Sequence, residues 1–222
     1  MGSKVDVTNQ VSVGILTFDG VSAVACALTV NTAGKITTDS FTGTYSVSPN
    51  GSGSISMKDS SNVTIALALM IGSSAKTLQL LQTNPNGDTA VMTGTATAQG
   101  SVGFSNATLK GRYAVLETSW VTTSDSGSSA VPIGVVAVVT FDGVGKVSSF
   151  SNTTANGVSK SGSSQGTYSV KSDGTGTVKL TDKKRNLSTY TAVINSSGKG
   201  FQFFWANCKC GNSAVAGTGV HQ

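Results

Sequence analysis

The chain has 222 residues, of which 38% are apolar and only 11% are charged, and it contains 27 glycines but 3 prolines. This composition allows a buried core and excludes collagen-like and disordered chains. The net charge of +5 comes from dispersed lysines and arginines. Their one cluster, Lys183–Arg185, lies between two strand-like segments, so we expect a solvated turn there and no nucleic-acid partner.

The same composition indicates an exported protein. With so few charges, Ser, Thr, Asn and Gly must supply most of the polar surface, as in many bacterial surface proteins, so we expect an extracellular or cell-surface location. The opening Met-Gly-Ser-Lys leads straight into polar sequence, so no signal peptide is expected within this chain. The most apolar run, Ile65–Ile71, is shorter than the roughly 18 to 20 residues of a membrane span, and none is expected.

Residues 1–10 are predicted to form an extended N-terminal arm. Val5, Val7, Val11 and Val13 share one parity, and this period of two continues without a Gly or Pro turn into the strand predicted at 11–18. The arm therefore has no turn that would fold it back beside that strand in the same module.

Residues 11–98 are predicted to form a first β-module. Strand-forming runs are separated by turn dipeptides such as Asp19-Gly20 and Asn50-Gly51, and helix signals are almost absent. Two motifs recur later in the chain, TFDGV at 17–21 and GTYSV at 43–47. Residues 99–108 are expected to be a linker.

Residues 109–222 repeat the first module at a constant offset. GTYSV recurs at 166–170 and TFDGV at 140–144, and both give the same offset, 166 − 43 = 123 and 140 − 17 = 123. Further pairs keep it: Gly51 with Gly174, Gly53 with Gly176, Lys76 with Lys199, and Gly94 with Gly217. A constant offset without insertions predicts two homologous modules of one fold.

The second module is predicted to contain eight antiparallel strands. Their expected ranges are about 109–120, 133–141, 145–153, 163–171, 175–182, 187–195, 199–206 and 213–221. Short turns between consecutive strands favour an up-and-down meander, which would close into a small barrel because closure removes exposed edges. The predicted fold class is therefore all-β, with two tandem barrel-like modules, and β-sandwich modules are the alternative.

Several segments carry a resemblance to known proteins. They are FSNATLKGRY at 104–113, TFDGVGK, GTYSV, DGTGTV, YTAVINSSGKGF and the closing AGTGV. Over nearly its whole length the chain resembles tandem β-modules of uncharacterised secreted proteins from environmental bacteria of the acidobacterial type. This resemblance implies a tandem β fold and secretion from the cell. It implies no activity and no catalytic residues.

The first module is predicted to lack its first strand. Subtracting 123 from the opening strand at 109–120 gives positions before residue 1. A barrel short of one strand exposes two edges and part of its core, and such edges attract strand addition. We therefore expect a segment of a neighbouring subunit to fill the gap. A native chain that begins earlier than this sequence is the alternative.

The expected function is structural. The N-terminal arm and the open edge of the first module are different surfaces. Contacts between the arm of one copy and the edge of the next would therefore propagate into a ring or a filament, so the expected partner is the protein itself. The expected product is an extracellular filament built by donor-strand complementation, with Val5, Val7, Val11 and Val13 as its interface residues. The alternative is a secreted, lipocalin-like barrel that binds a small apolar or glycan ligand.

Side chains suited to catalysis are scarce. The only histidine, His221, is next to the C-terminus, where fraying is expected, and the only glutamate is Glu117. Asp19, Asp142 and Asp173 lie in predicted turns, where Asp is favoured because it hydrogen-bonds the backbone. We therefore expect neither enzymatic activity nor a cofactor.

Three cysteines are too few for a four-ligand zinc site, and no well-placed histidine completes one, so no metal is expected. In an oxidising compartment Cys26, Cys208 and Cys210 would favour one disulfide and one spare thiol. Cys26 lies in an apolar run, which favours a buried free thiol there. Asn-x-Ser/Thr patterns predict candidate glycosylation sites at Asn62, Asn106, Asn152, Asn186 and Asn195.

Overall fold

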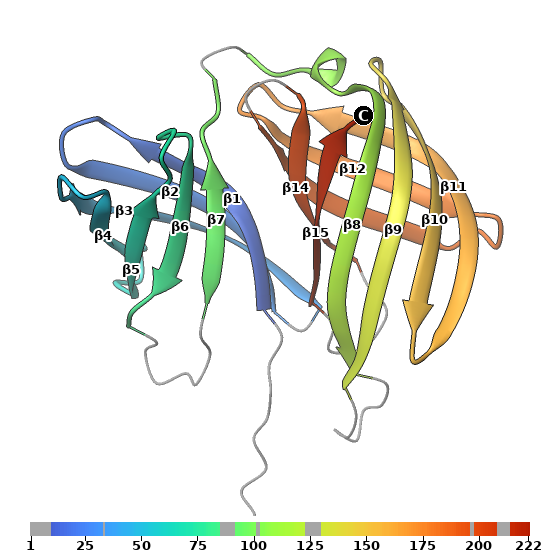
Figure 1. Cartoon of the computed structure of the whole chain (residues 1–222), viewed down its shortest axis with the longest axis horizontal. Coiled ribbons are helices and arrows are strands. Elements are labelled where there is room, and N and C mark those ends of the chain that lie inside the picture. The colour runs from blue at the N-terminus through green and yellow to red at the C-terminus, as the bar shows by residue number, and fades with distance from the viewer. Residues whose placement is uncertain are drawn as a thin grey trace, which may run out of the picture. The chain divides into compact units, whose positions relative to one another are not determined.

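The computed structural model describes residues 10–32, 34–84, 92–100, 103–122, 130–195, 198–207 and 214–222. These residues form an all-β protein of fifteen strands and one short 3-10 segment, η1 (Asn106–Thr108) (Figure 1). Within each of two sheets, β1 to β7 and β8 to β15, strands that follow one another in the chain pair with each other, as in a meander. No helix among the described residues has the length and apolar character that a membrane crossing requires.

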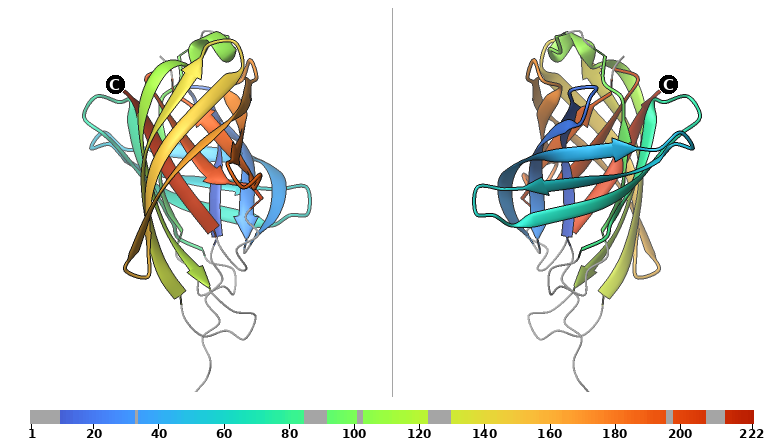
Figure 2. Two further views of the ribbon diagram at one scale, coloured as in Figure 1. Left: turned by 90° about the vertical axis from the view of Figure 1, so that its right-hand side faces the viewer. Right: turned by 90° about the vertical axis from the view of Figure 1, so that its left-hand side faces the viewer.

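The second module is a closed barrel of eight antiparallel strands (Figure 2, left). The strands are β8 (Lys110–Thr122), β9 (Ala130–Asp142), β10 (Lys146–Ala155), β11 (Val158–Val170), β12 (Thr175–Asp182), β13 (Leu187–Ile194), β14 (Gly200–Trp205) and β15 (Ala214–His221). Pairing of β15 with β8 closes the barrel, with Val220 opposite Ala114. The predicted eight-stranded barrel is confirmed, and the β-sandwich alternative is wrong.

The first module is a curled, open sheet of seven strands (Figure 2, right). The strands are β1 (Gln10–Phe18), β2 (Ala23–Thr32), β3 (Lys35–Val47), β4 (Ser52–Lys58), β5 (Thr64–Ile71), β6 (Thr77–Gln82) and β7 (Thr93–Thr97). They follow one another across the sheet in this order, so β1 and β7 are its outer strands.

The two sheets correspond strand for strand. Adding 123 to β2 gives 146–155, the bounds of β10, and adding 123 to β3 gives 158–170, the bounds of β11. The register is also kept: Thr42 faces Lys58, and Gln165 faces Thr181, with 42 + 123 = 165 and 58 + 123 = 181. Strands β1 to β7 therefore match β9 to β15, and β8 has no counterpart among the described residues.

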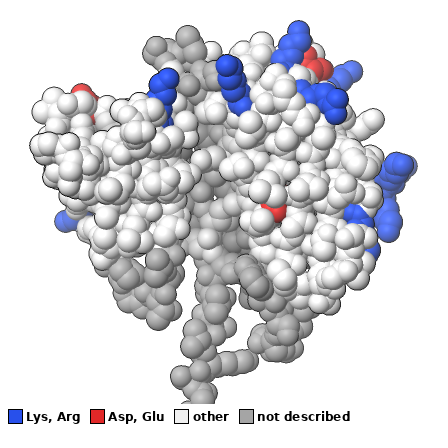
Figure 3. Space-filling view, in the orientation of Figure 1, with Lys and Arg blue, Asp and Glu red and all other residues white. Residues whose placement is uncertain are grey.

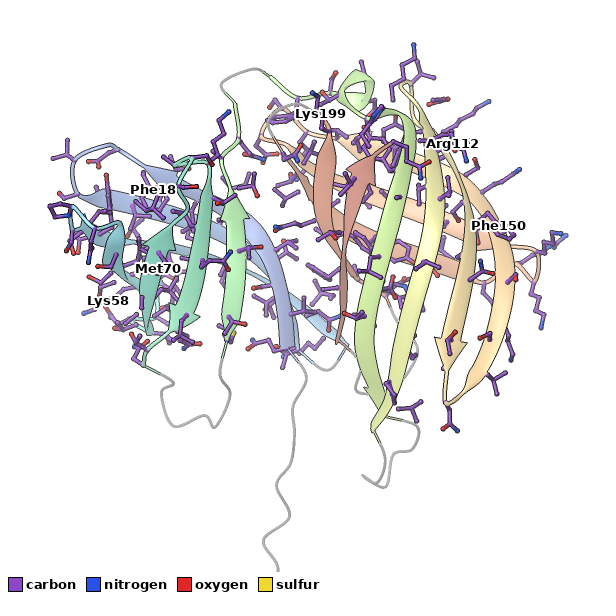
Figure 4. All side chains as sticks on the ribbon, in the orientation of Figure 1. Phe18, Lys58, Met70, Arg112, Phe150 and Lys199 are labelled. Atoms are coloured by element: carbon purple, nitrogen blue, oxygen red, sulfur yellow. The ribbon has the colours of Figure 1, made fainter. Side chains whose placement is uncertain are left out.

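Aromatic side chains fill one end of the barrel. Tyr113 contacts Phe141 edge-on with ring centroids 5.4 Å apart, and Phe141 contacts Tyr168 at 4.8 Å and Phe201 at 5.8 Å. The Tyr113 hydroxyl donates to the Gly198 carbonyl at 2.5 Å, which satisfies the buried phenol. Side chains on the outer wall alternate with these, and Phe150 on β10 is 52% exposed (Figure 4).

The predicted linker also takes part in the barrel. Phe104 is buried in the barrel core, and the Asn106 carbonyl accepts a hydrogen bond from the Tyr168 hydroxyl at 2.9 Å. Asn106 Oδ1 accepts from the Val170 amide at 2.8 Å. By compactness the chain divides into two units. One is made of Gly14–Leu28 with Thr38–Gln99, and the other holds the barrel together with the N-terminal segment through Val13 and with Thr29–Thr37.

Candidate assembly site

The open sheet has a gap at the place that β8 occupies in the barrel. Strand β8 pairs with β15 on one side and with β9 on the other. The counterparts of these two strands are β7 and β1, the outer strands of the open sheet. Within the described part of the chain, neither outer strand has a second partner, so a strand added between them would complete the pattern of the barrel.

The core of the open sheet is less covered than that of the barrel. Four pairs of inward positions that differ by 123 show this difference, whereas three other pairs, Val24 with Val147, Ile55 with Val178 and Leu69 with Ala192, are buried in both sheets. In the barrel the members of the four pairs are buried, with exposed fractions between 2% and 8%, whereas in the open sheet they are half-buried. The four pairs are Val139 with Leu16, Phe141 with Phe18 (Figure 4), Tyr168 with Tyr45, and Phe203 with Leu80.

The barrel indicates which side chains would fit the gap. Tyr113 on β8 lies opposite Val139 and His221, and subtracting 123 gives Leu16 and Ala98 as the walls at that level. Opposite Leu16 an incoming strand therefore has room for a large apolar side chain. Gly14 and Ala96 are the corresponding walls next to a residue in the place of Val115, and both are small. The gap thus suits a strand with alternating apolar residues.

Two of the four predicted assembly residues lie in β1. Val11 is half-buried and Val13 is 8% exposed. Because side chains alternate along a strand, both lie on the face opposite Leu16 and Phe18, which pack in the core. The other two, Val5 and Val7, lie outside the described residues, as does most of the predicted arm.

Glu117 and His221 do not form a catalytic pair. His221 is the last residue of β15, its amide donates to the Lys199 carbonyl at 2.7 Å, and its ring packs edge-on against Tyr113 at 4.9 Å. The predicted fraying of His221 is therefore wrong. Glu117 lies four residues farther along β8 than Tyr113, a distance of roughly 13 Å along the strand. Its carboxyl group faces the barrel interior, where it is 8% exposed.

The aspartates of the duplicated turns bind the backbone. Asp19 Oδ1 accepts from the amides of Val21, Ser22 and Ala23 at 2.8 to 2.9 Å, and these donors, led by Val21, lower the pKa of Asp19. Asp142 makes the equivalent three bonds 123 residues later. Asp173 accepts from the amide and the hydroxyl of Thr175. Each carboxylate therefore has a structural role in its turn.

Cys26 is a buried free thiol, 5% exposed, and burial raises its pKa to about 11. A thiol with so high a pKa is a poor nucleophile at neutral pH. Cys208 and Cys210 lie outside the described residues. Across the described ranges, no group of three or more potential ligands from His, Cys, Asp and Glu is placed to hold a metal ion.

The candidate glycosylation sites divide into two groups. Asn62, Asn152 and Asn186 are exposed, whereas Asn106 and Asn195 are half-buried. Asn195 Oδ1 accepts from the Gly200 amide at 2.9 Å, and a glycan there would have to displace this bond. Basic side chains are scattered over a mostly uncharged surface in the view of Figure 3.

No family model matches the chain, and no curated protein was found to match it. The resemblance to acidobacterial-type secreted β-modules therefore stays a prediction.

Proposed function

We propose that the chain is a structural subunit that assembles into an extracellular filament, in which the arm of one copy adds a strand to the open sheet of the next. One observation carries this proposal: four inward positions that are buried in the closed barrel are only half-buried in the open sheet, whose two outer strands each pair on one side only within the described residues. An apolar edge of this kind invites strand addition.

The expected energy gain is of the same size as the cost of ordering the arm. Each backbone hydrogen bond of an added strand contributes about 0.5–1.5 kcal/mol, and each fully enclosed valine about 1.5–3 kcal/mol. Ordering the arm costs about 1–2 kcal/mol per residue. Assembly therefore requires a preformed gap, in which only the arm has to be ordered because the rest of the sheet holds the walls in place. Since donor and acceptor surfaces differ, each added copy presents a new gap, and the contact propagates.

Deletion of residues 1–10 is the first test. Size-exclusion chromatography with light scattering and negative-stain microscopy should show assemblies for the native chain and single copies for the deletion variant. A matched pair refines the test: Val7→Asp places a charge on the valine face of the arm, whereas Thr8→Asp places the same charge on its other face. Only Val7→Asp, alone or with Val5→Asp, should abolish assembly.

A competing peptide tests the gap itself. A synthetic peptide with the sequence of residues 109–122, added before assembly, should occupy the gap of the first module and reduce filament number as its concentration rises. The same peptide with Tyr113→Asp and Val115→Asp is the control, because its charges would face the core. The proposal is wrong if the native chain stays a single copy, or if filaments form unchanged without residues 1–10.

A further inference from the structure

The positive charge of the chain lies in its second module. Residues 109–222 contain 11 basic and 5 acidic residues, a formal net charge of +6 (11 − 5), whereas residues 1–108 contain 4 and 5, a net charge of −1 (4 − 5). Because the two modules share one strand order, this difference in charge does not come from the fold.

Three lysines share the outer wall of β10 to β12. Lys146 on β10 lies opposite Thr167 on β11, and Thr167 lies opposite Lys179 on β12. The Lys171 amide donates to the Thr175 carbonyl at 2.8 Å, so Lys171 lies level with the start of β12. The three lysine side chains are exposed, because the residues next to them in each strand point into the core.

The turn after β12 extends this row of cations. It contains Lys183–Arg185, and all three side chains are exposed. Lys179 lies four residues before this turn and four residues after Thr175, the level of Lys171, and four residues span roughly 13 Å along a strand. The three wall lysines and this turn are called the basic face here. They form a row about 26 Å long, with Lys146 beside it.

The wall between these cations is polar and uncharged. The structure describes β11 and β12 completely, and apart from Lys179 their outward positions hold Ser, Thr and Gln residues, with no acidic side chain. The nearest carboxylates, those of Asp142, Asp173 and Asp182, lie at the turns beside the basic face, and backbone amides bind one oxygen of each. The basic face is thus a cationic surface with many hydroxyl groups.

The first module shows that the fold does not need these cations. Subtracting 123 from Lys146, Lys171 and Lys179 gives Ala23, Ser48 and Ser56. The basic turn corresponds to Ser-Ser-Asn at 60–62, and the two turns are built alike. Asp182 Oδ1 accepts from the amides of residues 184 and 186, and Asp59 Oδ1 accepts from those of residues 61 and 63. The same turn therefore forms without a positive charge.

Arg185 is not the residue that this turn favours. Its φ is 66°, in the left-handed region, and the corresponding Asn62 has a φ of 64°. Asn adopts this conformation more readily than Arg, because its short side chain can hydrogen-bond locally. An arginine at this position lowers the stability of the turn, which points to a role for its charge outside the fold.

We propose that the basic face binds a linear acidic polysaccharide, a chain of sugars that carry carboxylate groups. The Lys and Arg side chains pair with carboxylates along the polymer, and the Ser and Thr hydroxyls between them hydrogen-bond the sugar hydroxyls. The row spans several sugars, so many weak contacts add up along one polymer. This inference does not depend on assembly.

Other anionic partners fit the basic face less well. Eight strands share one full turn of the barrel, so neighbouring strands face directions about 45° apart (360/8), and Lys146 and Lys179 point about 90° apart. A flat membrane meets one of these directions at a time, whereas a polymer follows the curve. Single-stranded nucleic acid is bound largely by aromatic stacking, and the outward positions of β11 and β12, both fully described, hold no aromatic residue. The first module of another copy offers little attraction, since its net charge is −1 (4 − 5).

Fluorescence anisotropy with labelled polymers tests the class of ligand. The full chain is titrated with polygalacturonate at about 0.1 M salt, where surface charges are partly screened. Dextran has the hydroxyls without the charge, and poly-L-glutamate has the carboxylates without the sugars. Single-stranded DNA and phosphatidylserine vesicles represent the other anionic partners. We expect saturable binding of polygalacturonate, at least about tenfold tighter than that of every other probe.

Substitutions that copy the first module test the face itself. One variant combines Lys146→Ala, Lys171→Ser and Lys179→Ser, and a second combines Lys183→Ser, Lys184→Ser and Arg185→Asn. Each should weaken polygalacturonate binding about tenfold or more, because three exposed ion pairs are lost, and each should reduce its salt dependence. The second variant should also be slightly more stable, since Asn suits the left-handed position.

The control removes the same charge from the first module. Lys35→Gln, Lys58→Gln and Lys76→Gln together should leave polygalacturonate affinity within about twofold of the native chain. Circular dichroism and light scattering verify that all variants keep the same fold and assembly state. The proposal is overturned if polygalacturonate does not bind, if another probe binds as tightly, or if the variants of the basic face bind as the native chain does. An equal loss in the control would also overturn it, because net charge alone would then explain the binding.

Discussion

At the scale of single residues, Glu117 is an ionisable side chain whose burial lowers the stability of the folded protein. A carboxyl group that is 8% exposed resists ionisation, because burial disfavours its charged form, and its pKa rises from 4.5 to about 7. The folded protein therefore binds more protons than the unfolded chain between these two pH values. Stability falls as pH rises through this window and is lowest above about pH 7, where the buried group is charged.

Replacement of Glu117 should remove this pH dependence. Glu117→Gln keeps the shape without the charge, so we expect it to raise the melting temperature at pH 8 and to leave it nearly unchanged at pH 4. The stabilisation at pH 8 is on the order of 3 kcal/mol, the free energy that corresponds to a pKa raised from 4.5 to about 7. Calorimetric melting curves across this pH range measure the effect, with Thr118→Ala as a control. An equal change at both pH values would show that the charge is not the cause.

At the scale of the strands, the duplication provides matched positions in two environments. Phe141 is 2% exposed in the closed barrel, and Phe18, its counterpart, is half-buried in the open sheet. Phe141→Ala should destabilise the barrel by about 3–5 kcal/mol, the usual range for a buried phenylalanine. Phe18→Ala should destabilise the open sheet by less, because less surface is lost from contact.

Assembly should change this order. Once a partner strand covers the gap, Phe18 becomes as buried as Phe141, so Phe18→Ala should weaken the assembled form more than the single copy. Hydrogen exchange read by mass spectrometry separates the two sheets, since each gives its own peptides. Equal losses of protection for Phe18→Ala in the two forms would mean that nothing covers this position on assembly.

The sequence allowed the strands to be predicted far better than the sites. The strand order could be predicted because short turns and the alternation of apolar and polar residues determine a meander. The missing strand could be predicted because the turn motifs around Asp19 and Asp142 recur at one constant offset. Phe104 and Asn106 were interpreted as linker, since a short capping segment has no periodicity. His221 was expected to fray because it lies next to the C-terminus. The sequence does not show that its ring packs against Tyr113. The stacking of Tyr190 on Trp205 could not be predicted, since only the pairing of β13 with β14 brings the two rings together.

At the scale of the whole molecule, the two sheets should differ in their ability to fold alone. The barrel pairs every strand on both sides, and its core is closed, so a fragment of residues 103–222 should fold cooperatively and remain a single copy. The open sheet keeps two outer strands and a half-covered core, so a fragment of residues 1–100 should aggregate or exchange its amides rapidly.

Adding the peptide of residues 109–122 should keep the fragment of residues 1–100 soluble and slow its amide exchange, because the peptide supplies the strand that has no counterpart in the open sheet. Chromatography with light scattering and hydrogen exchange measure both outcomes, and the charged peptide with Tyr113→Asp and Val115→Asp should not rescue. A fragment of residues 1–100 that is stable and single without any peptide would mean that the open sheet needs no added strand, which would contradict the proposed assembly.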